Sequence, residues 1–371
     1  MLFVFVYFLE KNLSYNDFLC MFVSEKDTNT GISMREKNCA LTQGESASYN
    51  RIEFIDLAKG ICIILVVCLH LIITVDIPKI NILRMPLYFL LSGLFFKDYG
   101  CFSGFIIRKI NKMLIPFIFF YLLSCLYYNF IYRPIAPFET FPMGVFDPFL
   151  NKYFYNIALW FLLALFWSNI LFFFIYRLCP KEWIRGIVVL FIGLLGHFLY
   201  LNSINLPLFI APAFTSLPFF YAGYLIKKTP ILYKNILGKW NIPVALLIYA
   251  STLLLPDIEI DLRINMVEGN IFLFYIEALL LVISLLLICK TINKLPVLSY
   301  LGRYSIIVLC THIYLRDPFF LVLGILGGVQ REIVQAITLI AIVLLMYKVI
   351  PFCLKYLPYV TAQKNVIRIP A

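Results

Sequence analysis

Long apolar stretches alternate with short polar segments along the chain after residue 50. A stretch of about 17 to 25 apolar residues bounded by charges or proline is long enough to cross a bilayer as a helix. Ten such stretches occur, near residues 57–75, 82–97, 104–131, 155–176, 184–202, 206–226, 242–256, 270–289, 303–324 and 333–352. The pattern predicts an all-α, polytopic integral membrane protein with about ten transmembrane helices.

Composition and loop charge agree with this interpretation. Hydrophobic residues make up 62% of the chain and charged residues 14%, which excludes an ordinary soluble domain. If the N-terminus is cytoplasmic, the loops on the cytoplasmic side contain cations such as Arg185 and Lys228. The loops on the opposite side contain acidic residues such as Asp257 and Glu268. This alternation predicts an even number of spans with both termini in the cytoplasm. The net charge of +11 then reflects topology and contact with anionic membrane lipid, and it does not suggest nucleic-acid binding.

The N-terminal segment lacks the periodic apolar pattern. Residues 1–50 are interpreted as a disordered lead-in, or as a segment placed before the true start, because Met34 would open a short charged tail. Residues 51–355 form the expected transmembrane domain, and residues 356–371 are expected to be a cytoplasmic tail. Ten scattered cysteines show no paired spacing, so neither a disulfide framework nor a metal site is expected.

One ionisable side chain lies inside the first apolar stretch. His70 belongs to an apolar run that begins at Gly60, and Lys59 lies immediately before this run. An ionisable group in a membrane span is costly and usually has a function. The spacing from Lys59 to His70 places both side chains on nearly the same helical face, about 16 Å apart along the axis. Asp56, one turn before Lys59, is expected to pair with it.

Several segments resemble the acyltransferase-3 family of integral membrane O-acyltransferases, and most closely its fucose 4-O-acetylase-like branch. The family's first helix carries a basic residue, ten others and then histidine, as in RIEFIDLAKG at 51–60 followed by His70. The similar segments further along are MPLYFLLSG at 85–93, KINKMLIP at 109–116, ALWFL at 158–162, LPFFYAGY at 217–224 and LGRYS at 301–305 with His312 downstream. The resemblance therefore covers the chain from Arg51 to the end of the tenth span.

The resemblance implies transfer of an acyl group, generally acetyl from acetyl-CoA, to a hydroxyl of a glycan or lipid-linked sugar. The donor would be a substrate, and no bound cofactor is implied. Phosphates of acetyl-CoA would bind Arg108, Lys109 and Lys112, near Lys59. His70 would act as the general base that takes the proton of the acceptor hydroxyl, and a covalent acyl-histidine relay is the alternative.

Some of these assignments have plainer alternatives. The family usually has arginines where this chain has Lys109 and Lys112, and lysine lacks the two-pronged geometry of arginine. These cations are also what a cytoplasmic loop normally contains. Trp160 would either stack on an acceptor sugar or belong to an interfacial aromatic belt. His312 is a secondary candidate in a supporting role.

Two function classes remain open on the sequence. The first is an O-acetyltransferase of cell-surface or secreted glycans in the bacterial inner membrane. The second is a transporter or flippase of a lipid-linked sugar or small solute, which would require repeated broken helices with buried charges in both halves. Retention of the fold for binding alone is a third reading. Nothing in the sequence specifies an oligomeric state.

Overall fold

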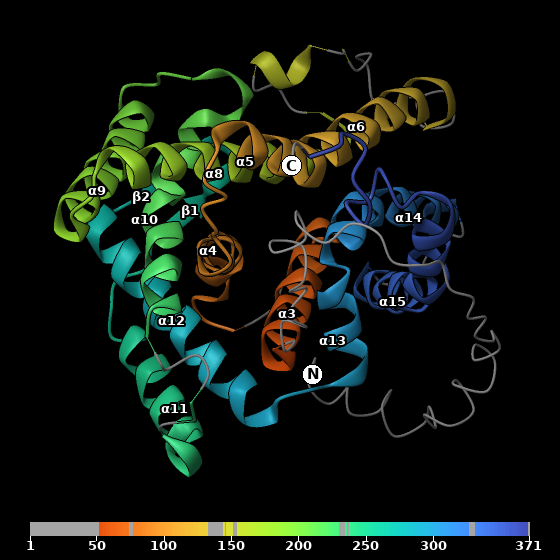
Figure 1. Cartoon of the computed structure of the whole chain (residues 1–371). Helices are drawn as coiled ribbons and strands as arrows, with labels where there is room; N and C mark the ends of the chain where they lie inside the picture. The colour runs from red at the N-terminus through yellow and green to blue at the C-terminus, as the bar shows by residue number, and fades with distance from the viewer. Residues whose placement is uncertain are drawn as a thin grey trace, which may run out of the picture.

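The computed structural model describes residues 52–73, 77–132, 144, 146–150, 154–229, 234–235, 237–325 and 331–369. The expected lead-in at residues 1–50 lies outside these ranges. The described chain is mostly helical, and its helices pack side by side in a bundle (Figure 1). The first half contains α3 (Glu53–His70), α4 (Ile80–Leu94), α5 (Phe102–Lys109), α6 (Ile115–Tyr127), α8 (Trp160–Leu178) and α9 (Glu182–Leu201). The second half contains α10 (Ile210–Lys227), α11 (Asn241–Thr252), α12 (Ile271–Ile292), α13 (Pro296–Arg303), α14 (Ser305–Ile325) and α15 (Arg331–Tyr356).

Helices occupy all ten predicted segments. Six described helices are both long and apolar enough to cross a membrane: Phe102–Tyr132, Ile157–Leu178, Glu182–Leu201, Pro207–Lys227, Ile271–Ile292 and Glu332–Tyr356. The first of these joins α5 and α6 through a π-helical segment, Ile110–Leu114, and ends in a second one, Tyr128–Tyr132. The helical membrane class is thereby confirmed, while the count of ten and the orientation of the termini stay predictions.

Two details differ from the sequence expectation. The first helix was expected at residues 57–75, but α3 runs from Glu53 to His70 and is followed by a turn in which Ile72 has a φ of 57°. His70 therefore lies in the last turn of its helix. The loop after α11 contains a small antiparallel sheet, β1 (Glu259–Asp261) and β2 (Met266–Glu268), which an all-α prediction omits.

Glycines allow two helix pairs to pack with their backbones almost in contact. A Cβ atom on Gly93 of α4 would lie 1.8 Å from the Phe220 carbonyl oxygen of α10, and one on Gly223 of α10 would lie 1.8 Å from that of Leu90. The same holds between α3 and α13, where Gly60 and Gly302 lie at the contact. Small residues at such crossings are the usual means of helix association in membranes.

Gly93→Ala is expected to destabilise the protein by roughly 1–3 kcal/mol or more, because α4 and α10 must separate to admit the methyl group. Gly104→Ala in α5 is the matched control, since nothing lies within 4 Å of its added Cβ and alanine favours helix. Thermal unfolding of both variants in detergent checks this. Equal transition temperatures for Gly93→Ala and the wild type would contradict the close packing.

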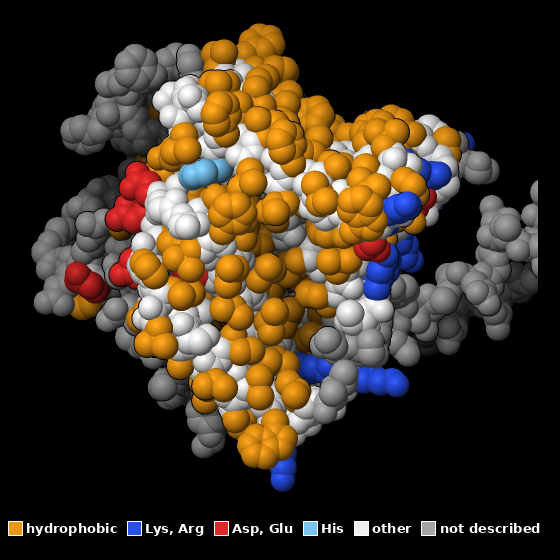
Figure 2. Space-filling model, turned by 90° about the vertical axis from the view of Figure 1, so that its left-hand side faces the viewer, with side chains coloured by type: hydrophobic (Ala, Val, Ile, Leu, Met, Phe, Trp, Pro, Cys, Tyr) orange, Lys and Arg blue, Asp and Glu red, His pale blue; other side chains and the backbone are white. Residues whose placement is uncertain are grey.

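One broad face of the bundle is apolar. Figure 2 shows hydrophobic side chains covering this face, with acidic side chains mostly along one edge and basic side chains along the opposite edge. Large exposed hydrophobic residues on the helices at this side include Trp183, Ile187, Phe191, Phe198, Leu246, Leu247, Phe272 and Ile276. Monomeric soluble proteins rarely expose such a surface, so it is suited to contact with lipid tails.

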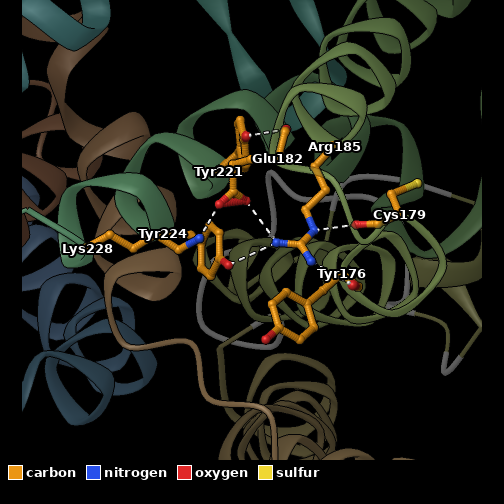
Figure 3. A network of polar contacts seen from close by, with 7 residues as sticks. All are labelled: Tyr176, Cys179, Glu182, Arg185, Tyr221, Tyr224 and Lys228. Atoms are coloured by element: carbon orange, nitrogen blue, oxygen red, sulfur yellow. Dashed lines mark hydrogen bonds and ion pairs between the residues drawn. The ribbon is translucent and has the colours of Figure 1, made fainter.

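A polar network ties α8, α9 and α10 together at one end of the bundle (Figure 3). Arg185 Nη1 donates to Glu182 Oε1 at 2.8 Å and to the Tyr224 hydroxyl at 3.1 Å, and its Nε donates to the Cys179 carbonyl oxygen at 2.6 Å. Lys228 forms an ion pair with the other oxygen of Glu182. Arg185 is thereby satisfied although it is buried, so its charge has a structural use.

Candidate active site

His70 faces a second histidine. The rings of His70 and His312 have centroids 5.1 Å apart and planes inclined by 46°. His70 comes from the last turn of α3, and His312 comes from α14, where it is buried with 1% exposure. Residues 242 positions apart, from 70 to 312, are thus brought together by the packing of α14 on α3. The structure therefore places the expected base and the supporting histidine in one site.

The hydrogen bond of His312 shows which of its ring nitrogens is free to accept a proton or a hydrogen bond. Nδ1 lies 2.9 Å from the Val308 carbonyl oxygen, which can only accept, so Nδ1 carries the proton. In the neutral ring, Nε2 is then an acceptor, and it is buried without a hydrogen-bond partner in the described chain. Buried polar atoms are normally paired, so an unpaired acceptor beside His70 is a candidate functional group.

Three residues that the sequence analysis did not select hold the last turn of α3. Arg316 donates from Nη1 to the His70 carbonyl oxygen at 3.3 Å, and its Nε donates to Asp317. The second carboxylate oxygen of Asp317 accepts a hydrogen bond from the Tyr155 hydroxyl. Asp317 is 2% exposed. Because ionisable residues inside a span are rare, Arg316 and Asp317 within the expected span 303–324 were a usable sequence signal.

The expected donor-binding cations gather around the segment that links α4 to α5, at the opposite end of α3. The Arg108 guanidinium lies 4.3 Å from the Tyr99 ring centroid, Lys109 Nζ lies 5.2 Å from that of Phe105, and Lys59 Nζ lies 5.2 Å from that of Phe95. Lys112 is exposed. The network of Arg185 and Lys228 joins this end, because neighbouring Lys227 donates to the Phe96 carbonyl oxygen at 2.5 Å. We call this the basic end of the bundle.

Asp56 and Lys59 lie as their spacing predicted. Asp56 Oδ1 is 4.0 Å from Lys59 Nζ, and its other oxygen is 4.0 Å from Arg303 Nε of α13. Asp56 is 6% exposed, so it bridges α3 and α13 beside Gly60 and Gly302. The Lys59 backbone carbonyl accepts a hydrogen bond of 2.9 Å from the Tyr88 hydroxyl of α4. Lys59 lies in the second turn of α3 and His70 in the last turn, with a rise of about 16 Å between them.

Trp160 is the first residue of α8 and is 7% exposed. Its ring contacts Phe161 and Phe209, with centroids 6.2 and 6.1 Å away. Its contacts give Trp160 a packing role in the bundle.

Asn111 fastens the C-terminal tail to the basic end. Its side-chain oxygen accepts from the backbone N–H groups of Val366 and Ile367, both at 2.9 Å, and its amide donates to the Ile367 carbonyl oxygen at 2.9 Å. Asn111 is 1% exposed and lies between Lys109 and Lys112 in the π-helical segment. Figure 1 shows the C-terminus beside the helix formed by α5 and α6. The tail thus covers part of the segment expected to bind the donor.

Asn111→Ala is expected to release the tail, because three hydrogen bonds to it are lost at once. Amide hydrogen exchange at residues 361–367 should become faster by about tenfold or more, with exchange in α12 unchanged. Asn202→Ala is the control, since Asn202 is exposed at the C-terminal end of α9 and its side chain donates locally to the Phe198 carbonyl oxygen. Unchanged protection of the tail in Asn111→Ala would contradict this fastening.

No group of three or more His, Cys, Asp or Glu side chains within the described ranges is arranged to hold a metal ion. The site consists instead of two imidazoles, an arginine–carboxylate–tyrosine cluster and a separate set of cations. The imidazoles can take a proton from a hydroxyl at the C-terminal end of α3, and the cations can attract a polyanion at the basic end.

A comparison with protein-family models matches residues 52–353 to a model described as an acyltransferase domain, the acyltransferase-3 family. The chain belongs to this family. The comparisons with curated proteins and with solved structures gave no match. The family inferred from the sequence is therefore confirmed, and the protein is a membrane acyltransferase, while the fucose 4-O-acetylase-like branch stays a prediction. The matched region of this acyltransferase includes the histidine pair, Arg316, Asp317 and the cations of the basic end.

Proposed function

We propose that this membrane acyltransferase transfers acetyl from cytoplasmic acetyl-CoA to a hydroxyl of a cell-surface or secreted glycan, as in the fucose 4-O-acetylase-like branch. We place it in the bacterial inner membrane with both termini in the cytoplasm. The observation that carries the proposal is the facing pair His70 and His312, with an unused acceptor nitrogen on His312. A transporter or flippase of a lipid-linked sugar or small solute stays the alternative.

In this mechanism His70 takes the proton of the acceptor hydroxyl as its oxygen attacks the thioester carbonyl carbon. A C–O bond forms, the C–S bond breaks, and the CoA sulfur leaves with the electron pair. The proton on His70 then neutralises the leaving thiolate, so the histidine is regenerated. Arg316 holds the backbone of His70 through its carbonyl oxygen, and the His312 ring lies beside the His70 ring.

The donor would bind with its phosphates at the basic end and its acyl group toward His70. Lys109 and Lys112, together with Arg108 and Lys59, supply the charge that attracts these phosphates. The rise of about 16 Å from Lys59 to His70 then has to be spanned by the extended arm of the donor. Release of the tail held by Asn111 would widen access to this segment.

Replacing Lys109 and Lys112 together by alanine is expected to weaken acetyl-CoA binding by about tenfold or more, because two charge-assisted contacts to phosphate are lost. Isothermal titration of purified protein in nanodiscs, with no acceptor present, measures this directly. The control is Lys348→Ala, which removes an exposed cation of α15. Equal affinity of the double variant and the wild type would remove these lysines from the donor site.

A further inference from the structure

A small cavity lies between the end of α3 and the start of α4. Its volume is about 240 Å³. The lining residues are Leu65, Leu69, Ile72, Ile73, Ile80, Asn81 and Arg84. Five of them are aliphatic, and Leu69 and Ile72 are 49% and 62% exposed, so the apolar wall continues to the outside of the bundle. The cavity is therefore open to the outside of the bundle, where α3 ends and α4 begins.

Arg84 is the one charged side chain in this lining. It is half-buried and has no hydrogen-bond or ion-pair partner in the part of the chain that the structure describes. The Asp261 carboxylate, in the loop before α12, is paired with Arg263 at 3.2 Å and forms no ion pair with Arg84 among the described residues. A half-buried guanidinium with five donors normally finds an acceptor.

Lys79, at the start of the same helix, shows how this protein satisfies a buried cation. Its Nζ lies 3.0 Å from Glu277 and 3.1 Å from Asp257, and it donates to the carbonyl oxygens of Leu255 and Pro256. Every available donor of Lys79 is thus used within the fold. Arg84, unlike Lys79, therefore has donors that are available to a ligand.

We propose that this cavity, which we call the Arg84 cavity, binds the phosphate and the first part of the apolar chain of a polyprenyl-phosphate-linked acceptor. Arg84 binds the phosphate, and the leucine and isoleucine wall packs against the chain. A cavity of this size admits such a group but not a whole oligosaccharide. The inference rests on the proposed function, because it names the class of acceptor that the transferase would use.

The position of the Arg84 cavity fits this use. Leu69, which lines it, is adjacent in sequence to His70, so the cavity lies at the last turn of α3. A phosphate held at Arg84 would therefore leave the attached sugar beside the last turn of α3. Binding of the carrier at this point would present a sugar hydroxyl to the histidine pair.

The test is the binding of farnesyl phosphate to the full-length protein in detergent micelles, followed by native mass spectrometry without acetyl-CoA. Farnesol, inorganic phosphate and phosphatidylglycerol are the comparison ligands. We expect the wild type to bind farnesyl phosphate about tenfold or more tightly than farnesol, and Arg84→Gln to lose this difference. Arg84→Lys should retain part of it, and Lys348→Gln, which removes an exposed cation of α15, should retain all of it.

Equal binding of farnesyl phosphate by the wild type and Arg84→Gln would overturn the inference. So would displacement by phosphatidylglycerol at the same concentration, which indicates a general lipid contact, or equally tight binding of inorganic phosphate. Because the assay contains no acyl donor, its outcome is independent of acetyl transfer. Arg84-dependent binding by a protein that transfers no acetyl would support the cavity and contradict the proposed function alone.

Discussion

His70→Ala is expected to lower kcat for acetyl transfer by about 100- to 10,000-fold, the range that a positioned general base contributes. Acetyl-CoA binding should change little, because the basic end lies about 16 Å away along α3. The measurement is CoA release from acetyl-CoA in the presence of a glycan fraction from the host, with purified protein in nanodiscs. It is compared with a separate titration of acetyl-CoA.

His197→Ala is the matched control for His70→Ala. His197 lies on α9, where its ring stacks on that of Tyr200, and α9 lies on the other side of the bundle from α14 (Figure 1). Its removal should leave kcat within about twofold, because His197 is separated from the residues assigned to the chemistry. A His70→Ala protein that keeps wild-type kcat would remove His70 from the mechanism, whatever the outcome for His197.

Lys79→Met is expected to lower the free energy of unfolding by roughly 3–5 kcal/mol, the usual cost of removing one partner from a buried ion pair. Glu277 is fully buried in α12, and Lys79 Nζ lies 3.0 Å from its Oε1. Without Lys79, this carboxylate would remain in an apolar helix bundle. Chemical unfolding in mixed micelles, followed by circular dichroism, measures the loss.

Two further variants test whether the loss of stability comes from the Lys79–Glu277 ion pair or from another effect of replacing Lys79. Replacing Lys79 by Met and Glu277 by Leu together should recover much of the stability, because both buried charges are then absent. Lys239→Met, at an exposed lysine, should change stability by less than about 0.5 kcal/mol. A Lys79→Met protein that is as stable as the wild type would show that the pair does not hold α4 to α12.

The sequence predicted those features that depend on local pattern. The lengths of the apolar stretches predicted where the helices lie. The spacing of Asp56 and Lys59 predicted that the two side chains pair, and their charged atoms lie 4.0 Å apart. The helix ends were predicted less accurately. The apolar residues continue past His70, but the chain turns at Ile72, where φ is positive. Hydropathy alone does not register a change in backbone direction.

The parts of the site that sequence could not specify are contacts between distant segments. Arg316 bonds to the His70 carbonyl across 246 positions, and Asn111 bonds to Ile367 across 256 positions. The periodicity of apolar residues along the sequence does not predict such pairings, because they depend on how the helices pack against one another. Glu277 and Asp317, in contrast, lie inside expected spans, and the argument used for His70 applied equally to them.

Acetyl transfer through His70 is tested most directly by a single-turnover experiment, with labelled acetyl-CoA bound to the purified protein before the glycan fraction is added. We expect the wild type to transfer the acetyl label to the glycan, and His70→Ala to bind the same amount of acetyl-CoA and transfer none. Label transfer by His70→Ala at the wild-type rate would contradict the role of His70. A folded wild-type protein that binds no acetyl-CoA would contradict the donor assignment itself.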